Sequence, residues 1–94
     1  MELRHIRYFK AVAEEKNFTR AAEKLAIAQP PLSRQIQDLE AELGTSLFIR
    51  SPHKVTLTEE GELFMQYASQ ILDLVNRSEE ELKEMKEGLQ GTLY

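Results

Sequence analysis

Cysteine is absent from this 94-residue sequence, and histidine occurs only twice, at His5 and His53. Without cysteine the chain forms neither a disulfide framework nor a thiolate metal site, which is typical of a reducing cytoplasm. Two histidines far apart in the sequence supply neither the ligand spacing of a metal site nor a nucleophile–base pair. We therefore expect no enzyme activity, no catalytic or metal-binding residues and no cofactor in this chain.

Long apolar runs are also absent. No segment approaches the roughly 18 consecutive apolar residues of a membrane span, and residues 1–10 include no apolar run of signal-peptide length. A length of 94 residues suffices for one small domain. We expect a soluble cytoplasmic protein without a membrane partner.

Positive charge is scarce overall, since the formal net charge is -4. The average hides an uneven distribution. Residues 1–57 carry nine Lys and Arg against seven Asp and Glu, whereas residues 58–94 carry three against nine. The first part of the chain can therefore still present a basic face to a polyanion.

Apolar residues at helical spacing predict two helices within residues 1–25. The first covers about residues 2–15, and the second is about two turns long and begins after Lys16. Asn17 and Thr19 are both suited to cap the second helix, which is too short to be stable without packing against its neighbours. The apolar positions are Leu3, Ile6, Phe9, Val12 and Ala13 in the first helix and Phe18, Ala21, Ala22 and Leu25 in the second.

Two consecutive prolines mark the start of a third helix, residues 30–43. Proline is favoured in the first turn, because its missing N–H is one that a helix leaves unpaired there and its φ angle is already helical. The second helix, a connection at residues 26–29 and this third helix have the outline of a helix-turn-helix, although the turn lacks the glycine often found there. The stripe that we expect to pack inward consists of Leu32, Ile36, Leu39 and Leu43.

The other face of the third helix carries side chains that suit nucleic acid. Arginine pairs bidentately with guanine, glutamine pairs with adenine, and serine donates to a phosphate or a base edge. Because Asp38, Glu40 and Glu42 all lie in the second half, a polyanion can approach only the first half, where the helix dipole also favours negative charge. The candidate contacts on this face are Gln29, Ser33, Arg34 and Gln37.

A β-hairpin is predicted directly after the third helix. Gly44 ends the helix, and residues 47–50 and 55–57 form two short β segments around a turn. No acidic residue occurs between positions 44 and 58, so this is the most one-sidedly basic stretch of the chain. A hairpin in this position is a wing, and its basic residues are Arg50, His53 and Lys54.

Both features also have a simpler interpretation. Composition alone favours an ordinary solvated face for the third helix, and a basic hairpin can serve general solubility. For the third helix, three features together favour nucleic-acid contact over a solvated face. They are the short preceding helix, the proline-defined start and the hairpin that follows.

A fourth helix is predicted over residues 59–89, with Thr58 as its N-cap and acidic residues in its first turn. Residues 91–94 are predicted to leave this helix and to start a strand. A 3.5-residue apolar repeat held over more than three heptads is typical of a helix–helix seam. Nothing else in the chain is long enough to cover it, so we expect a homodimer, with intramolecular packing as the alternative. The seam positions are Phe64, Ala68, Ile71, Val75, Ser78, Leu82, Met85 and Leu89.

Four motifs together resemble the DNA-binding domain of LysR-type transcriptional regulators. They are LRHIRYF at residues 3–9, NFTRAAEKL at 17–25, AQPPLSRQIQDLEAELGTSLF at 28–48 and LTEEG at 57–61, with an arginine at position 50. The resemblance covers nearly the whole chain. The QPPLSRQI version looks most like the branch that regulates the degradation of aromatic compounds.

The resemblance implies a mainly α-helical fold, with a winged helix-turn-helix at residues 1–58 and a linker helix at 59–89 that pairs in an antiparallel dimer. It implies a bacterial cytoplasmic regulator of transcription. Its recognition helix, residues 30–43, would enter the major groove of double-stranded DNA, and its wing, residues 48–57, would lie near the minor groove of an inverted-repeat operator. Residues 90–94 would begin a missing domain that binds a small-molecule effector, and such regulators commonly form tetramers.

The resemblance also assigns individual residues. Thr19 matches a phosphate-contacting position, and Arg50, His53 and Lys54 fall in the wing, whose tip has fewer arginines than that of many members. The recognition-helix positions are Gln29, Pro30, Pro31, Ser33, Arg34 and Gln37.

Two other functions stay open at this point. The chain can be a protein-interaction module in which the long helix is the functional surface and the winged helix is scaffold, which salt-insensitive or absent DNA binding would favour. An RNA-binding winged helix is distinguished by competition with single-stranded RNA.

Overall fold

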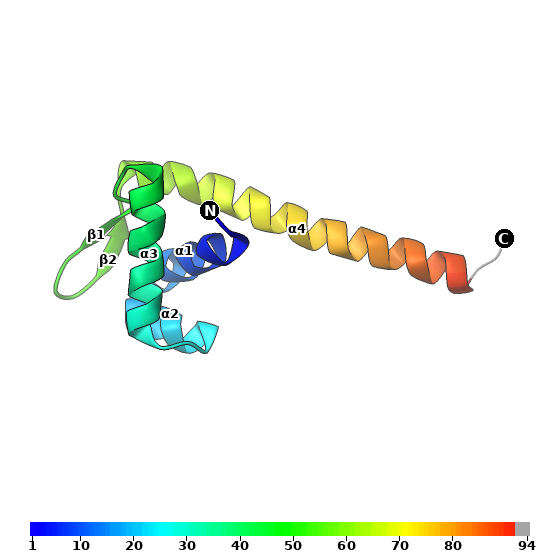
Figure 1. Cartoon of the computed structure of the whole chain (residues 1–94), viewed down its shortest axis with the longest axis horizontal. Coiled ribbons are helices and arrows are strands. Elements are labelled where there is room, and N and C mark those ends of the chain that lie inside the picture. The colour runs from blue at the N-terminus through cyan, green and yellow to red at the C-terminus, as the bar shows by residue number, and fades with distance from the viewer. Residues whose placement is uncertain (92–94) are drawn as a thin grey trace.

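The computed structural model describes residues 1–91, with the side chains of residues 1–88. Three helices and a hairpin form a compact body, and a long fourth helix extends away from it (Figure 1). The mainly α-helical winged helix-turn-helix with a long helix after it is confirmed. In chain order the elements are α1 (Leu3–Glu15), α2 (Phe18–Leu25), α3 (Gln29–Leu43), β1 (Phe48–Arg50), β2 (Val55–Leu57) and α4 (Glu59–Gly91).

The helix boundaries lie within two residues of the predicted ones. The third helix begins at Gln29, one residue early, and α4 continues to Gly91. The prediction that Gly91 leaves the helix is therefore wrong. A strand needs a neighbouring strand for its hydrogen bonds, whereas one more helical residue bonds to the preceding turn of its own helix. Residues 92–94, predicted to start a strand, lie outside the described residues.

The turns between the helices use left-handed residues other than glycine. Lys16 ends α1 with a φ of 55°, and Ala26 ends α2 with a φ of 58°. The backbone N–H of Ile27 donates to the Ala22 carbonyl at 3.0 Å, which closes the end of α2. Of the two candidate caps of α2, Asn17 is the one used, since its side chain accepts from the Arg20 N–H at 2.9 Å.

The four phenylalanines of the chain form one cluster at the centre of the body. Phe9 on α1 is fully buried, with its ring centroid 5.2 Å from that of Phe48 on β1 and 4.9 Å from that of Phe64 on α4. Phe48 in turn meets Phe18 at the start of α2, at 6.0 Å. The hairpin, α1, α2 and α4 therefore share one aromatic core.

The predicted inward stripe of α3 is confirmed at three of its four positions. Leu32, Ile36 and Leu39 are 0% exposed, whereas Leu43 at the end of the helix is 36% exposed. Leu3, at the start of α1, is likewise 42% exposed against expectation. Both leucines lie in terminal helical turns, which other elements cover less completely than the helix middles.

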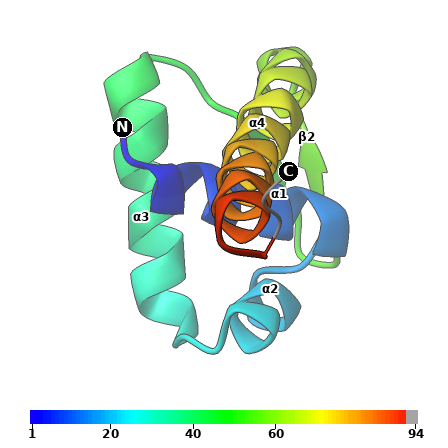
Figure 2. The same ribbon diagram turned by 90° about the vertical axis from the view of Figure 1, so that its right-hand side faces the viewer.

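The first part of α4 packs on the chain's own core. Ala68 is fully buried, and Phe64 and Ile71 pack against the same cluster. The prediction that Ala68 faces a second copy of the chain is therefore wrong, whereas the half-buried Phe64 and Ile71 stay predicted seam positions. The heptad pattern could not reveal that α4 crosses over α1 before it extends away from the body (Figure 2).

The rest of α4 is free of the body. Every residue from 76 to 87 is exposed, which includes the predicted seam positions Ser78, Leu82 and Met85, while Val75 is half-buried. The side chain of Leu89 lies outside the described residues. With 33 residues the helix is about 50 Å long. Within residues 1–91, no helix has the length and apolar character needed to cross a bilayer.

The joint between the wing and α4 is closely packed. Thr58 caps α4 as predicted, because its hydroxyl accepts from the Gly61 N–H at 2.9 Å and donates to the Ser46 carbonyl at 2.7 Å. A Cβ on Gly61 would lie 2.1 Å from the Leu47 carbonyl oxygen and 3.0 Å from a methyl carbon of Leu57. Glycine at position 61 is therefore required by close backbone approach.

We expect Gly61→Ala to lower the free energy of unfolding by about 1–3 kcal/mol, because the added methyl group overpacks the joint. This loss outweighs the gain of about 1 kcal/mol that alanine brings as the better helix former. Denaturant unfolding followed by circular dichroism measures the change. The adjacent Glu62→Ala, at an exposed position, is the control and should stay within about 0.5 kcal/mol of the parent chain. An unchanged or raised stability of Gly61→Ala would contradict the close approach.

Candidate nucleic-acid interface

The predicted recognition residues lie together on the outer face of α3. Pro30, Pro31, Arg34 and Gln37 are exposed, and Gln29 and Ser33 are half-buried, whereas the opposite face of the same helix is fully buried. The apolar stripe therefore fixes which way the polar face points. The first two turns of α3 therefore present hydrogen-bonding groups to solvent.

The start of α3 offers fewer backbone donors than a typical helix. Ala28 is its N-cap and provides no side-chain bond, and Pro30 and Pro31 have no N–H. In the first turn only Gln29 and Leu32 keep an N–H, and that of Leu32 donates to the Ala28 carbonyl at 3.4 Å. The dipole argument for an anion at this end is thus weaker than the sequence indicated. The two prolines instead present an apolar surface that suits a thymine methyl group.

The wing is a tight antiparallel hairpin. Its register pairs Phe48 with Leu57, Ile49 with Thr56 and Arg50 with Val55. The turn is closed by Ser51, whose hydroxyl donates to the Lys54 carbonyl at 2.9 Å and accepts from the Lys54 N–H at 3.3 Å. His53 and Lys54 are exposed at its tip.

Contacts at both ends hold the wing against the helices. At its base, a Glu40 carboxylate oxygen on α3 accepts from the N–H groups of Leu47 and Phe48, at 2.8 and 3.3 Å. Further along, the Arg50 guanidinium lies 4.4 Å from the centroid of the Phe18 ring and donates to the Ser33 hydroxyl at 3.3 Å. The wing and the recognition helix therefore form one continuous surface.

A shallow groove of about 200 Å³ separates the wing tip from the start of α2. Thr19, His53 and Lys54, which the sequence assigned to two separate elements, all line it. Lys16 lines it as well, and the sequence reasoning missed this residue. The sequence feature that pointed to Lys16 is its position directly before Asn17, the cap of α2. Lys16 and Lys54 give the groove two cationic groups, and none of its lining residues is acidic.

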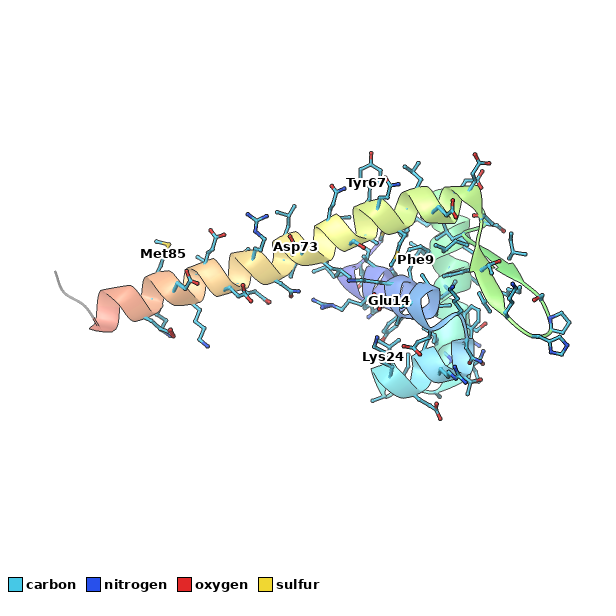
Figure 3. The ribbon with its side chains drawn as sticks, turned by 180° about the vertical axis from the view of Figure 1, so that it is seen from behind. Phe9, Glu14, Lys24, Tyr67, Asp73 and Met85 are labelled. Carbon is cyan, nitrogen blue, oxygen red and sulfur yellow. The ribbon has the colours of Figure 1, made fainter. Side chains whose placement is uncertain are left out.

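The cations of this surface lack carboxylate partners. Among the described side chains, Arg34, Arg50, Lys54 and Lys16 make no ion pair, because the chain's ion pairs lie elsewhere. Glu42, one of the acids in the second half of α3, pairs with the N-terminal ammonium at 2.7 Å. Lys24 pairs with Glu14 and Glu15, and Figure 3 labels Lys24 and Glu14. Positive charge on the α3–wing surface is therefore available to an external anion.

Metal chemistry has no basis in the described part of the chain. Among residues 1–88, no group of three or more His, Cys, Asp or Glu side chains is placed to hold an ion. The arrangement suits hydrogen bonding and charge recognition.

A second exposed surface runs along α4. Five large apolar side chains lie within about 100° of arc at 100° per residue, and we call them the α4 stripe. Figure 3 shows two of them, Tyr67 and Met85, projecting from the side of α4 that faces away from the body. The α4 stripe consists of Leu63, Tyr67, Leu74, Leu82 and Met85, each more than half exposed.

Sequence comparison finds relatives among named regulators of transcription. The chain is 60% identical over 77 residues, 82% of its length, to the HTH-type transcriptional regulator BenM of Acinetobacter baylyi. It is 55% identical over 93 residues, 99% of its length, to the HTH-type transcriptional regulator BudR of Raoultella terrigena. The chain spans only 25% and 32% of the length of these two proteins. Neither is named as an enzyme, in agreement with the sequence prediction.

Structural comparison leads to the same group. The crystal structure of the BenM_DBD/catB site 1 DNA complex matches with a TM-score of 0.90 and 55% sequence identity, covering 94% of this chain and 99% of that one. Residues 3–62 match the family described as bacterial regulatory helix-turn-helix protein, lysR family. The chain therefore belongs to the lysR family of bacterial regulatory helix-turn-helix proteins.

Proposed function

We propose that this chain is the sequence-specific DNA-binding part of a bacterial LysR-type transcriptional regulator, with α3 in the major groove and the wing near the minor groove. One observation carries the proposal. A helix whose inner face is fully buried presents exposed hydrogen-bonding side chains beside cations that have no carboxylate partner among the described residues. The DNA complex of the related BenM_DBD supports this assignment.

The chemistry of the surface divides into two parts. Arg34, Gln29 and Gln37 can each make paired hydrogen bonds to a base edge, which supplies sequence preference. Thr19, Lys16 and the wing residues His53 and Lys54 surround the groove beside α2, where a DNA phosphate is the fitting ligand. Phosphate contacts supply affinity that falls with salt concentration.

A dimer on an inverted repeat is the assembly that we propose. The α4 stripe is apolar, long and uncovered within the described chain, and a second α4 is the surface of matching length and character. The α4 stripe shares the exposed Leu82 and Met85 with the predicted seam. Closer to the body it consists of Leu63, Tyr67 and Leu74, where the predicted seam had Phe64, Ala68 and Ile71. An antiparallel pairing of two copies would place one winged helix-turn-helix at each end.

The remaining expectations concern the whole protein. Since the relatives are about three times as long as this chain, we propose that a domain binding a small-molecule effector follows α4. Its start then lies beyond Gly91, where α4 ends, and not at the predicted residue 90. A cytoplasmic location and a tetramer of the full-length protein belong to the same proposal. The QPPLSRQI motif favours the branch that regulates aromatic-compound degradation.

A protein-interaction module is the second candidate, and the exposed α4 stripe is the observation that favours it. The two functions differ in their response to DNA. Selection from a random duplex pool at low salt, with the affinity of the selected duplex measured at rising salt concentration, separates them. Enrichment of an inverted repeat with a steep salt dependence supports the DNA reader, and binding of no duplex supports the interaction module.

We expect Arg34→Ala to weaken binding to the selected duplex by about 1–3 kcal/mol and to flatten the preference at one base pair of each half-site, because a bidentate contact to guanine is lost. Fluorescence anisotropy on the selected and single-base variant duplexes measures both effects.

The matched control for this experiment is Arg77→Ala, which removes the same charge from the exposed part of α4. It should leave the base preference unchanged. An equal loss on every duplex by Arg34→Ala would assign Arg34 to a phosphate instead of a base.

We expect Leu74→Lys to convert the dimer to a monomer, because a charge without a partner is costly to bury in an apolar interface. Leu74 is 59% exposed within the chain, so the fold of the single copy should be unaffected. Sedimentation velocity measures the oligomeric state, and circular dichroism checks the fold. Asn76→Lys, about 200° further around the helix, should remain dimeric. A Leu74→Lys variant that sediments as an unchanged dimer would exclude the α4 stripe as the interface.

A further inference from the structure

The guanidinium of Arg50, a residue of the wing, contacts two other elements, α2 and α3. Arg50 is the last residue of β1, its guanidinium lies over the ring of Phe18 at the start of α2, and it donates to the Ser33 hydroxyl on α3. Among the described residues no carboxylate pairs with it. The side chain is therefore held by a ring face and a hydroxyl, and its other N–H groups have no hydrogen-bond partner among the described residues.

The bond from Arg50 constrains the hydroxyl of Ser33. A serine hydroxyl has one proton to donate and two lone pairs to accept with. Arg50 carries donors only, so one lone pair of the Ser33 oxygen is occupied and its proton must point elsewhere. In the free chain the Ser33 hydroxyl is thus prepared to donate.

The proton of Ser33 is also not used by its own helix. Serine in a helix often donates to a carbonyl one turn back, as Ser78 does on α4 with a bond to the Val75 carbonyl at 2.7 Å. Among the described residues, the Ser33 hydroxyl makes no corresponding bond. Ser33 is half-buried beside the exposed Pro30 and Arg34, so its proton can reach a group outside the protein.

We infer that Arg50 is a positioning residue, which holds the Ser33 hydroxyl as a hydrogen-bond donor toward an acceptor atom of DNA. This inference rests on the proposed function. It changes the role that the sequence suggested for Arg50, from a wing residue that contacts DNA by itself to one that acts through the recognition helix.

The ring of Phe18 explains why Arg50 can keep this position. Phe18 is buried against Phe48 on one side, so the ring is fixed, and a guanidinium over a fixed ring has few other places to go. The planar fork of arginine allows stacking on the ring and donation to Ser33 at the same time. A neutral or shorter side chain at position 50 would lose one contact or both.

The acceptor that Ser33 meets has two possible sources. A guanine N7 or O6, an adenine N7 or a thymine O4 presents an acceptor in the major groove, whereas the amino groups of cytosine and adenine present donors. A phosphate oxygen presents an acceptor at every sequence. In both cases a hydroxyl fixed as a donor gains from the contact.

The test is a double-mutant cycle on DNA affinity. Ser33→Ala and Arg50→Met are measured singly and together on a duplex that the parent chain selects. A second cycle pairs Ser33→Ala with Lys54→Met, which removes a charge from the same hairpin without touching Ser33. Circular dichroism melting identifies any variant that fails to fold.

We expect Ser33→Ala to weaken binding about tenfold in the parent chain and less than about threefold when Arg50 is already Met, since a hydroxyl without its fixed orientation contributes less. With Lys54→Met, the effect of Ser33→Ala should stay about tenfold. Equal effects of Ser33→Ala in all three backgrounds would overturn the positioning role.

Two further measurements complete the design. The base preference of Ser33→Ala distinguishes the two sources of the acceptor. A lost preference at one base pair of each half-site identifies a base acceptor, and an equal loss of affinity on every duplex identifies a phosphate.

In the chain without DNA, NMR should show slowed rotation of the Arg50 guanidinium, and Ser33→Ala should release it. Free rotation in the parent chain would overturn the inference. A parent chain that binds no duplex would overturn the proposed function, and a duplex bound with an additive cycle would overturn this inference alone.

Discussion

The contact on which the rest of the structure depends is that of Phe9 with the aromatic rings around it. Phe9 is fully buried and lies against Phe48 of the wing and Phe64 of α4, and Phe48 lies against Phe18 of α2. Elements of two or three turns and a three-residue strand have little stability of their own. They share one core, so the wing, the short helix and the linker helix keep fixed positions relative to α1.

The candidate interface depends on a second set of contacts, between the wing and α3. The carboxylate of Glu40 binds the first N–H groups of the wing, and the guanidinium of Arg50 reaches Ser33 further along. A surface that reads bases needs its groups held close to the correct geometry by neighbouring side chains. In this chain Glu40 in the second half of α3 supports the base of the wing, whereas Ser33 in the first half accepts a bond from the wing and also belongs to the outward face. The first half of the helix therefore combines support with the candidate contacts, and the second half supplies support alone.

The long helix also has two faces with different tasks. Ala68 and Leu72 face the body and complete its core, whereas Tyr67 and Leu74 project from the other side, roughly a third of a turn away. The predicted repeat of four and three residues contains positions from both faces, because it includes the buried Ala68 as well as the exposed Leu82 and Met85. Burial against α1 uses one of them, and the other stays free along the part of α4 beyond the body.

The sequence by itself determined the elements, the family and the polar face of α3, because these follow from local periodicity, from proline and capping residues and from short motifs. It placed Arg34 and Gln37 outward correctly, since their position follows from the leucine stripe of the same helix. Contacts between distant segments were decided by the tertiary structure alone. The position of Lys16 beside the wing, the bond from Arg50 to Ser33 and the burial of Ala68 depend on how elements cross in space, and no spacing along the chain encodes such a crossing.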